Sequence, residues 1–354
     1  MHNADYLIAG QGLSGSILAF TLLRAGKTVH VIDLPELSSS SRIAAGVYNP
    51  FNFKRMINTW EAERLVPFAT AFYGDAEKQL GISFHKSRPI WKVLADANER
   101  TLWEKSFAER TGLFGEKDIL QNPLPGIVHA PHGIGVVQGS GNIDSFVFIT
   151  AVKNLLRSLN ALTETVFDYA QLSIQNGGVS YAGQIAARQF VNCQGHLSMQ
   201  TDLFAFLPMN KVKGEVLHLH IPQLETDAVL NRGAYLLPVS AGRYICGSTY
   251  DLEIADEQTS SAAQTEMLGK LSKFITADIT VERQFAGIRP ATRDRRPLLG
   301  RHPQHPELAI FNGMGSKAVF LAPWLAQELV AHLETGTELP READLKRFAR
   351  KLKF

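Results

Sequence analysis

Three glycines near the start of the sequence have the spacing of a loop that binds the phosphates of a dinucleotide. Gly10, Gly12 and Gly15 follow the apolar segment 6–9 and precede a helical pattern over 14–25 that begins with Leu13 and Ser14. The first glycine permits a tight turn, the second lets backbone approach the pyrophosphate, and the third lets the helix pack close to the strand. The free N–H groups at the start of that helix then face the phosphates.

An acidic residue closes the same unit. A second apolar segment over 28–32 ends in Asp33, whose carboxylate can accept hydrogen bonds from an adenosine ribose. An acid at this position disfavours a 2′-phosphate. Strand, glycines, helix, strand and acid in this order predict a dinucleotide-binding βαβ unit, and these residues alone leave FAD and NAD both open.

The remaining pattern predicts an α/β fold in two lobes, because 354 residues exceed the usual size of one hydrophobic core. Helical patterns cover 61–80, 98–110, 145–159, 262–274 and 317–334, the serine run 38–41 indicates a loop, and 164–169, 214–220 and 234–249 indicate strands. We expect a discontinuous Rossmann-type FAD-binding domain and a second, antiparallel-sheet substrate domain with an α+β arrangement. The expected boundaries are 1–80, 140–210 and 285–354 for the first domain, and 81–139 and 211–284 for the second.

The amino-acid composition excludes few classes of protein, but it limits the kinds of binding partner that we expect. Thirty-six Lys and Arg against 34 Asp and Glu give a formal charge of +2, which disfavours a large surface for gripping nucleic acid. The two cysteines lack the spacing of a zinc site or redox dithiol, and no metal-ligand motif occurs, so no metal is expected. Neither a basic leader nor a run of about 20 apolar residues is present, so we expect a cytoplasmic protein without membrane contact.

Several further segments resemble the FAD-dependent amine oxidoreductases related to D-amino acid oxidase, glycine oxidase and sarcosine oxidase. The residues 42–46, Arg-Ile-Ala-Ala-Gly, resemble the segment that this family lays along the flavin. The segment 164–167 resembles the strand that touches the adenine, and 191–195 resembles the strand that closes over the pyrophosphate. The most specific similarity lies near the C-terminus. The family's closing pattern is matched there, in order, by Gly-Ile-Arg-Pro at 287–290, by the segment 295–300, and by Gly-Met-Gly-Ser at 313–316.

This resemblance implies FAD as the cofactor. A helix N-terminus near 315–317 would place backbone dipoles where reduced flavin carries negative charge. The sarcosine oxidase branch bonds its flavin to a cysteine in this region, where this chain has Met314 and Ser316, so we expect noncovalent FAD. The implied cofactor-binding residues are Gly10, Gly12, Leu13, Ser14, Gly15, Asp33, Arg42, Ala44, Ala45, Gly46, Val166, Cys193, Gly195, Gly313, Gly315, Ser316 and Lys317.

The resemblance also implies oxidation of the C–N bond of a small amino acid or secondary amine by hydride transfer to flavin N5. Arg289 is the candidate for binding the substrate carboxylate, because a guanidinium pairs with both oxygens. Tyr235 and Tyr250 are the other candidate catalytic residues. No general base is required if the amine enters neutral, and oxygen or an unknown carrier would reoxidise the flavin, with Lys213 and Lys317 as candidate cations beside it.

Three alternatives to the oxidation of a small amine remain. The segments 45–50 and 313–318 also resemble the oxidase domain of a bifunctional tRNA-modifying enzyme, which oxidises a carboxymethylamino group on a tRNA base. A second alternative is an FAD-dependent hydroxy-acid or glycerol-phosphate dehydrogenase. The third is a flavoprotein kept as a binding subunit without turnover. Arg293, Arg295 and Arg296 are interpreted as a solvated turn.

Overall fold

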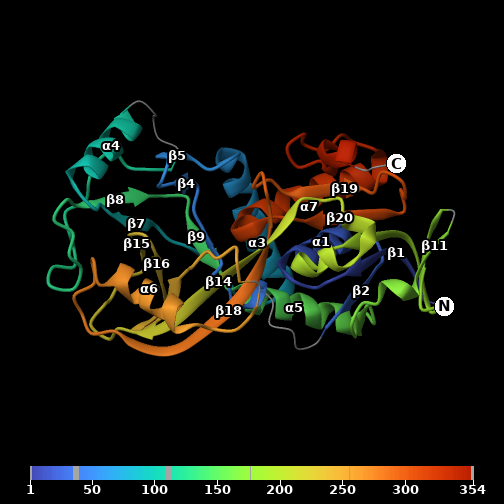
Figure 1. The fold of residues 1–354 in the computed structure, drawn as a ribbon, viewed down its shortest axis with the longest axis horizontal. Coiled ribbons are helices and arrows are strands. Elements are labelled where there is room, and N and C mark those ends of the chain that lie inside the picture. The colour runs from blue at the N-terminus through green and yellow to red at the C-terminus, as the bar shows by residue number, and fades with distance from the viewer. Residues whose placement is uncertain (1, 35–39, 109–113, 176, 255, 352–354) are drawn as a thin grey trace.

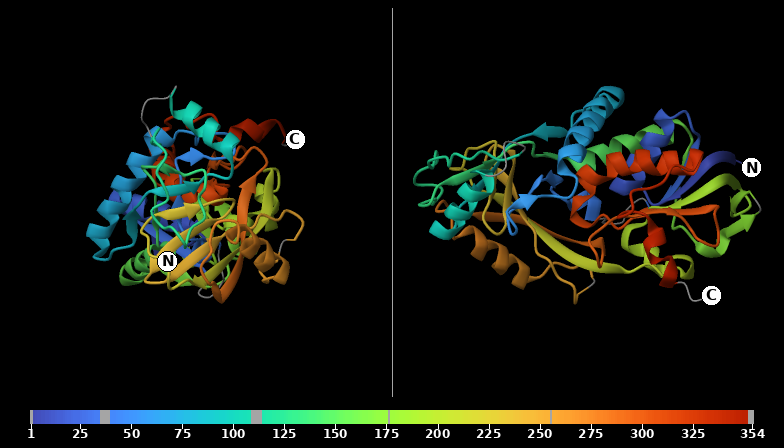
Figure 2. Two further views of the ribbon diagram at one scale, coloured as in Figure 1. Left: turned by 90° about the vertical axis from the view of Figure 1, so that its left-hand side faces the viewer. Right: turned by 90° about the horizontal axis from the view of Figure 1, so that it is seen from above.

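The computed structural model describes residues 2–34, 40–108, 114–175, 177–254 and 256–351. The molecule is elongated, with one large sheet in each half (Figure 1). Both ends of the chain lie in the half that holds the eight-stranded sheet, and the view from above shows the same (Figure 2, right). The first and last segments of the sequence therefore build the same lobe.

The eight-stranded sheet has a parallel core in which β1 (His2–Ala9) pairs with β2 (Val29–Asp33) and β13 (Ile185–Asn192). Its strands are apolar and buried because helices α1 (Leu13–Arg24), α5 (Ser145–Ser158) and α7 (Ala318–Thr335) pack together beside it. The other strands are β10 (Leu162–Glu164), β11 (Leu172–Gln175), β12 (Gly178–Tyr181), β19 (Leu298–Arg301) and β20 (Leu308–Asn312).

Five strands of this sheet, β10, β2, β1, β13 and β20, run parallel, so their carboxyl ends meet at one edge. Gly10 follows β1, Asp33 ends β2, and Cys193 follows β13. Val166 and Gly313 lie just beyond β10 and β20. In open α/β sheets ligands bind at this edge, and most of the predicted cofactor residues lie there.

The seven-stranded sheet has the order β18-β14-β17-β16-β15-β7-β8 and is antiparallel except between β15 and β7. Its two longest strands, β14 (Met209–His220) and β18 (Thr280–Thr292), run from this sheet toward the other lobe (Figure 1). The other strands are β7 (Ile90–Val93), β8 (Ile134–Val137), β15 (Val229–Asn231), β16 (Tyr235–Ser240) and β17 (Arg243–Gly247), and α6 (Ser261–Leu271) packs against β14.

Smaller elements join the two halves. A three-stranded sheet contains β3 (Val47–Tyr48), β9 (Gly141–Ile143) and β6 (His85–Ser87), and a hairpin contains β4 (Phe51–Asn52) and β5 (Ile57–Asn58). The remaining helices are α2 (Ser40–Ile43), α3 (Ala62–Leu80) and α4 (Ala97–Ala108), with short 3-10 turns η1 (Tyr169–Gln171), η2 (Gly195–Gln200), η3 (Asp202–Phe204), η4 (Gly315–Lys317) and η5 (Leu345–Lys351).

The predicted α/β class with two sheets is confirmed, and two local predictions are wrong. Ser40 and Ser41 begin a helical turn rather than a loop, while 38–39 lie outside the described residues. The strand expected over 164–169 ends at Glu164, and Asp168 caps the short turn η1 by accepting a hydrogen bond from the backbone of Ala170. The predicted domain boundaries at 210/211 and 284/285 fall inside β14 and β18, and the division stays a prediction.

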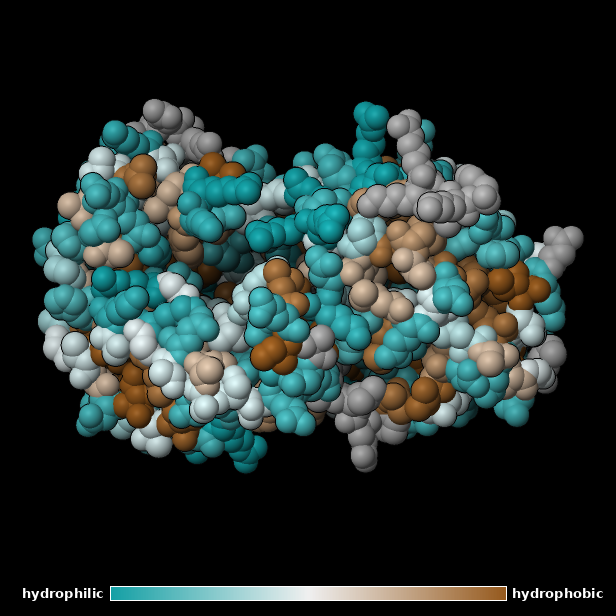
Figure 3. All heavy atoms as spheres, viewed as in Figure 1, coloured by the Kyte–Doolittle hydropathy of each residue, from teal (hydrophilic) through white to brown (hydrophobic). Residues whose placement is uncertain are grey.

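The surface of the face in Figure 3 is mainly hydrophilic, with hydrophobic residues in small separate groups. Within the described residues, no helix has both the length and the apolar character needed to cross a membrane. A search of the same residues finds no cluster of His, Cys, Asp and Glu suited to a metal ion.

A charge cluster ties α7 to the sheet. Glu334, near the end of α7, accepts hydrogen bonds from three side chains: Tyr6 on β1, Arg188 on β13, and Lys27 in the loop before β2. Although partial burial opposes ionisation, these donors hold the pKa of Glu334 at about 2. The carboxylate therefore stabilises the fold fully above its ordinary pKa of 4.5, and this contribution is lost as the pH falls toward about 2.

Glu334→Gln is expected to lower the free energy of unfolding by about 1–3 kcal/mol at pH 7, because charge-assisted hydrogen bonds are lost. Urea unfolding at pH 7 and at pH 3 measures the effect, which should shrink at the lower pH. Glu338→Gln is the control, since Glu338 is exposed and forms no ion pair with the described residues. An equal loss in both variants, or a Glu334 effect independent of pH, would contradict this interpretation.

Candidate functional site

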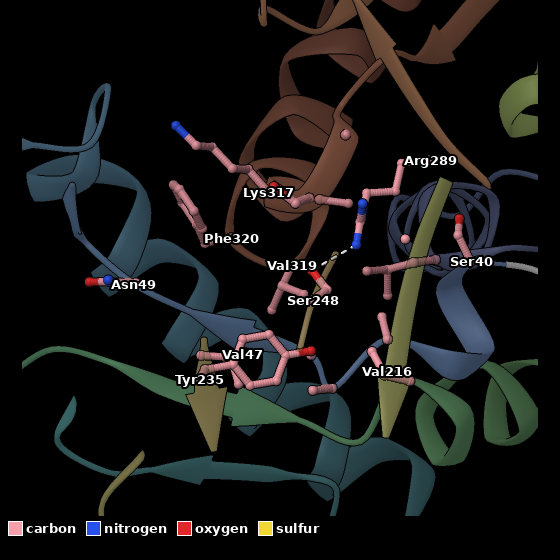
Figure 4. Close-up of a pocket in the computed structure, with 18 of the residues that line it drawn as sticks. Ser40, Val47, Asn49, Val216, Tyr235, Ser248, Arg289, Lys317, Val319 and Phe320 are labelled. Carbon is pink, nitrogen blue, oxygen red and sulfur yellow. Dashed lines mark hydrogen bonds between the residues drawn. The ribbon is translucent and has the colours of Figure 1, made fainter. Parts of the chain in front are cut away.

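A cavity of about 400 Å³ lies between the two sheets, and we call it the arginine cavity. One wall comes from β14, β16 and β18, and the opposite wall comes from the segment 43–52 and the start of α7. Figure 4 shows Arg289, Tyr235 and Ser248 on the sheet side and Lys317, Val319 and Phe320 on the α7 side. Within the described residues, no Asp, Glu or His lines this cavity.

Arg289, on β18, carries the positive charge at the centre of the cavity. Its Nη2 donates to Ser248 Oγ at 2.8 Å, and Nη1 donates to the carbonyl oxygen of Thr249 at 3.3 Å. The guanidinium lies across Gly214 on the neighbouring strand, where a Cβ would stand 1.9 Å from Nη2. Burial lowers the pKa of Arg289 from its usual value, and an arginine nevertheless stays charged.

No carboxylate of the described residues forms an ion pair with this arginine. Arg289 is therefore not a partner in a structural ion pair with the described residues. A half-buried guanidinium with only neutral acceptors retains donors for an anion, because its five N–H groups exceed its protein partners.

Tyr235 occupies the first position of β16 and points into the same cavity (Figure 4). Gly247 on β17 makes room for it, since a Cβ there would stand 2.6 Å from the phenol oxygen. Burial raises the pKa of Tyr235 above its ordinary value. The phenol therefore stays protonated at physiological pH and can donate a hydrogen bond.

A second cavity of about 490 Å³ lies at the carboxyl edge of the parallel strands, and we call it the glycine-loop cavity. It is lined by 10–14, by Asp33 and Arg42, by 166–169 and by 193–197. Leu13, Ser40, Ser41, Gly315 and Ala318 line both cavities, so the two spaces adjoin. An elongated ligand can extend from one into the other.

The glycine loop fits a phosphate group, because its glycines bring backbone together where side chains would clash. Gly10 has φ +96°, and a Cβ there would stand 2.7 Å from the carbonyl oxygen of Cys193. A Cβ on Gly15 would stand 1.9 Å from the carbonyl oxygen of Gly10, so Gly15 allows α1 to start directly beside the turn. At Gly12 the nearest atom is the Ser41 hydroxyl at 3.2 Å, which leaves the cavity side of the loop open.

Asp33 holds the loop from the end of β2. Its Oδ1 accepts the backbone N–H of Gln11 at 3.0 Å, and its Oδ2 lies 3.9 Å from Arg42 Nη2. Burial raises the pKa of Asp33, while the Gln11 hydrogen bond and the Arg42 charge oppose that rise. Phe167, Tyr169 and Gln194 complete this part of the cavity. Phe167 and Gln194 belong to the segments 164–167 and 191–195 singled out above, whereas no motif marked Tyr169.

The structure brings most of the predicted site residues into the two cavities. Of the predicted cofactor residues, all except Gly15 and Gly313 line one cavity or both. Arg289 and Tyr235 line the arginine cavity, but Tyr250 does not, and it is 58% exposed beyond the end of β17. Its proposed role stays a prediction.

Sequence reasoning missed the polar residues that hold Arg289. Ser248 and Thr249 follow β17, and nothing in their spacing marked them as partners of an arginine 40 residues later. Lys213, a candidate for a cation beside the flavin, points to the opposite face of β14 from Gly214 and Val216. Its ammonium bonds Asp256 at 2.6 Å and lies 3.7 Å from Glu215, so it does not line the arginine cavity.

Known proteins with similar sequences and a similar fold cover almost the whole chain. Glycine oxidase from Geobacillus kaustophilus (strain HTA426) is 22% identical over 96% of each chain. The tRNA 5-methylaminomethyl-2-thiouridine biosynthesis bifunctional protein of Aeromonas hydrophila is 24% identical over 96% of this chain, which spans only 57% of that protein. Among solved structures, glycine oxidase from Geobacillus kaustophilus has a TM-score of 0.79 at 20% identity, covering 98% of both chains.

A family model described as FAD dependent oxidoreductase (DAO) matches residues 5–332. This range includes the glycine loop, the carboxyl edge of the parallel strands, Tyr235 and Arg289. The chain therefore belongs to the FAD-dependent oxidoreductases of the DAO family, and it is an enzyme that uses FAD.

Proposed function

We propose that this enzyme oxidises the C–N bond of a small amino acid or secondary amine that carries a carboxylate. The observation that carries the proposal is Arg289, a half-buried arginine whose guanidinium faces the arginine cavity without a carboxylate partner among the described residues. A planar guanidinium binds both oxygens of a carboxylate and so fixes the orientation of the attached carbon. The names of the glycine oxidase relatives support the same substrate class.

The two cavities supply places for the parts of FAD. We propose that the glycine loop and the start of α1 hold the phosphates, Asp33 the adenosine ribose, and Ala44–Gly46 with Gly315–Lys317 the flavin. FAD, when bound, supplies the acceptor for two electrons and the hydrogen from the substrate carbon. No cysteine lies in these segments around the flavin position, which supports noncovalent binding.

The N-terminus of α7 supports the assignment of the flavin end. Gly315 at φ +54° turns the chain into η4 and then α7, and Gly315, Ser316 and Lys317 line the arginine cavity. Backbone N–H groups at a helix start favour negative charge nearby. Reduced flavin carries such charge, so this wall would stabilise the reduced cofactor.

The arginine cavity has no general base among the described residues that line it. The amine must therefore be neutral when its carbon–hydrogen bond breaks, and its proton is lost to solvent on entry. Tyr235 can orient the nitrogen or a carboxylate oxygen through its hydroxyl, and Arg289 fixes the other end of the molecule. Water then hydrolyses the resulting imine to an oxo acid and an amine or ammonia.

The pH profile follows from this arrangement. Log kcat/KM is expected to rise with slope one until the pH reaches the ammonium pKa of the substrate. Because burial raises the pKa of Tyr235, its neutral form persists above its ordinary value of 10, and no fall from its ionisation is expected below that pH. This is tested by measuring kcat/KM against pH for two amines whose ammonium pKa values differ. If the pH at which kcat/KM rises is the same for both amines, a base on the protein is responsible instead.

Tyr235→Phe is expected to lower kcat/KM by about 5–30-fold, the loss of one hydrogen bond worth about 1–2 kcal/mol. The ring still fills the space beside Gly247, so stability and FAD content should not change. Steady-state kinetics with sarcosine measure the effect. Tyr244→Phe is the control, because Tyr244 is not among the residues that line the cavity and its hydroxyl donates to the Leu224 carbonyl.

Product analysis tests the reaction itself. The FAD-loaded enzyme is incubated with glycine, sarcosine, proline and D-amino acids, with oxygen or an artificial carrier as the electron acceptor. The proposal expects an oxo acid and an equal amount of amine or ammonia. Oxidation of glycolate or glycerol phosphate in place of every amine would reject it in favour of a hydroxy-acid or glycerol-phosphate dehydrogenase.

A carboxymethylamino group on a tRNA base is the second candidate substrate. It contains the same glycine unit, so Arg289 could hold its carboxylate in the same way. The specific observation in its favour is the group of cationic side chains formed by Lys317, Arg55, Arg295 and Arg296, to which a small amino acid would not extend.

A further inference from the structure

Four cationic side chains gather on the α7 side of the arginine cavity, and we call them the cationic rim: Lys317, Arg55, Arg295 and Arg296. Lys317 lines the cavity, and Figure 4 shows its ammonium directed away from Arg289. Arg55 lies in the hairpin between Asn52 and Thr59, both of which line the same cavity. Arg296 stacks on the ring of Trp60 at 4.7 Å, immediately after Thr59.

The positive charges of the three rim arginines act on Lys317. Burial lowers the pKa of Lys317, and the charges of Arg296, Arg295 and Arg55 lower it further. Arg295 adopts a left-handed backbone, φ +58°, in a turn where its N–H bonds the Thr292 carbonyl at 3.1 Å. A non-glycine residue in this region is uncommon, and Arg295 is solvent-exposed, so the turn predicted here is present and has a defined backbone conformation.

No carboxylate of the described residues neutralises the rim. None of its four members forms an ion pair there, and Asp294, the nearest acid in sequence, instead bonds Arg347 at 3.0 Å. Like charges held together without a counter-charge destabilise a fold. Such an arrangement is typical of a site whose anion arrives with a ligand.

We propose that the substrate carries a second anionic group, which binds the cationic rim while its amino-acid end binds Arg289. This inference rests on the proposed function and extends it, since it specifies the part of the substrate beyond the oxidised C–N bond. Arg289 and Lys317 stand on opposite walls of the cavity, so one molecule with an anion at each end can reach both. The distal group is a carboxylate or a phosphate.

The exposure of the rim favours a substrate that projects out of the cavity. Lys317 and Arg296 are half-buried, whereas Arg55 and Arg295 are exposed. An amino acid bound at Arg289 alone would leave the outer two arginines without a partner. Phosphates beyond the cavity, on a small molecule or on a nucleic acid chain, have the chemistry to reach them.

A pair of substrates that differ only in distal charge tests the proposal: N-propylglycine and N-(carboxyethyl)glycine. We expect kcat/KM to favour the charged compound at low ionic strength, and added salt to reduce that preference. In the variant Arg55→Gln/Arg295→Gln, the ratio of the two kcat/KM values should fall by about tenfold. Both side chains are exposed, so neither change removes a buried contact.

Arg283→Gln is the matched control. Arg283 is an exposed arginine on β18, six residues from Arg289 and therefore roughly 20 Å along the strand. Its replacement should leave the ratio unchanged. A ratio near one in the wild type, or an equal fall in the control, would overturn the inference without touching the proposed oxidation.

Binding without turnover separates this inference from the proposed function. Propionate and glutarate are titrated into the FAD-loaded enzyme, with perturbation of the flavin absorption as the readout. Tighter binding of glutarate, lost in Arg55→Gln/Arg295→Gln, supports the rim even if no amine is oxidised. Equal binding of the two acids overturns it, whatever the activity.

Competition between tRNA and glutarate for the enzyme distinguishes the two possible sources of the distal anion. If unmodified tRNA displaces glutarate at micromolar concentration and low salt, and the rim variant abolishes this, the proposal is supported with a nucleic acid phosphate as the anion. If tRNA has no effect while glutarate still binds through the rim, the proposal is supported with a small dianionic amine as the substrate.

Discussion

Replacing Arg289 with alanine is expected to lower kcat/KM for a carboxylate-bearing amine by about 10²–10³-fold, equal to about 3–4 kcal/mol. The reason is that Arg289 is the only residue at the centre of the cavity whose geometry matches a carboxylate, within the described lining. Its removal also leaves the substrate carboxylate buried without a partner. Steady-state kinetics with glycine and sarcosine measure the loss.

Arg289→Lys is the companion variant, since it keeps the charge but loses the planar fork. It should recover part of the activity, because one oxygen can still be bonded. An amine without a carboxylate, such as benzylamine, should lose far less than glycine in either variant. If all substrates lose activity equally, Arg289 acts through the fold or the cofactor rather than through the carboxylate.

Gly12→Ala is expected to weaken FAD binding by at least about 100-fold while the protein still folds. The nearest obstacle to the new methyl group is the Ser41 hydroxyl at 3.2 Å, which is the end of a small side chain and can shift. The methyl group would nevertheless occupy the side of the loop where backbone must approach the pyrophosphate. Quenching of flavin fluorescence on titration into apoprotein measures the dissociation constant.

Two further glycine variants serve as a more severe change and as a control. Gly15→Ala should remove FAD binding and lower the melting temperature, since its methyl group would stand 1.9 Å from the Gly10 carbonyl oxygen. Gly74→Ala, inside α3 with nothing within 4 Å, should leave FAD binding unchanged and raise stability by about 1 kcal/mol. Wild-type FAD affinity in Gly12→Ala would show that the loop does not hold the phosphates.

The first βαβ unit could be predicted from the sequence because its parts are contiguous. The segment from β1 to Asp33 contains the strand, the glycines and the helix in one short run, and each residue type has a local reason. The ends of α3, α5 and α7 were also close to prediction, because their apolar periodicity or a terminal glycine such as Gly336 marks them. Elements whose signals lie within one short stretch of sequence can therefore be predicted from that stretch.

Contacts between distant segments could not be predicted in the same way. Ser248 bonds Arg289 only because β17 and β18 flank β14, an arrangement that no local pattern encodes. The turn that carries Arg295 and Arg296 could be predicted, but the effect of their charges on Lys317 could not, because Lys317 comes from a different element. Val166 was assigned to the adenine contact through a strand, whereas it lies in the loop after β10.

Anaerobic titration of the FAD-loaded enzyme, followed by visible absorption, tests the central claim most directly. The titrants are glycine, sarcosine, proline, a panel of D-amino acids, glycolate and glycerol phosphate. The proposed function predicts that an amine with a carboxylate bleaches the flavin band in the wild type and does so far more slowly in Arg289→Ala. Bleaching only by glycolate or glycerol phosphate, or by no compound at all, would contradict it.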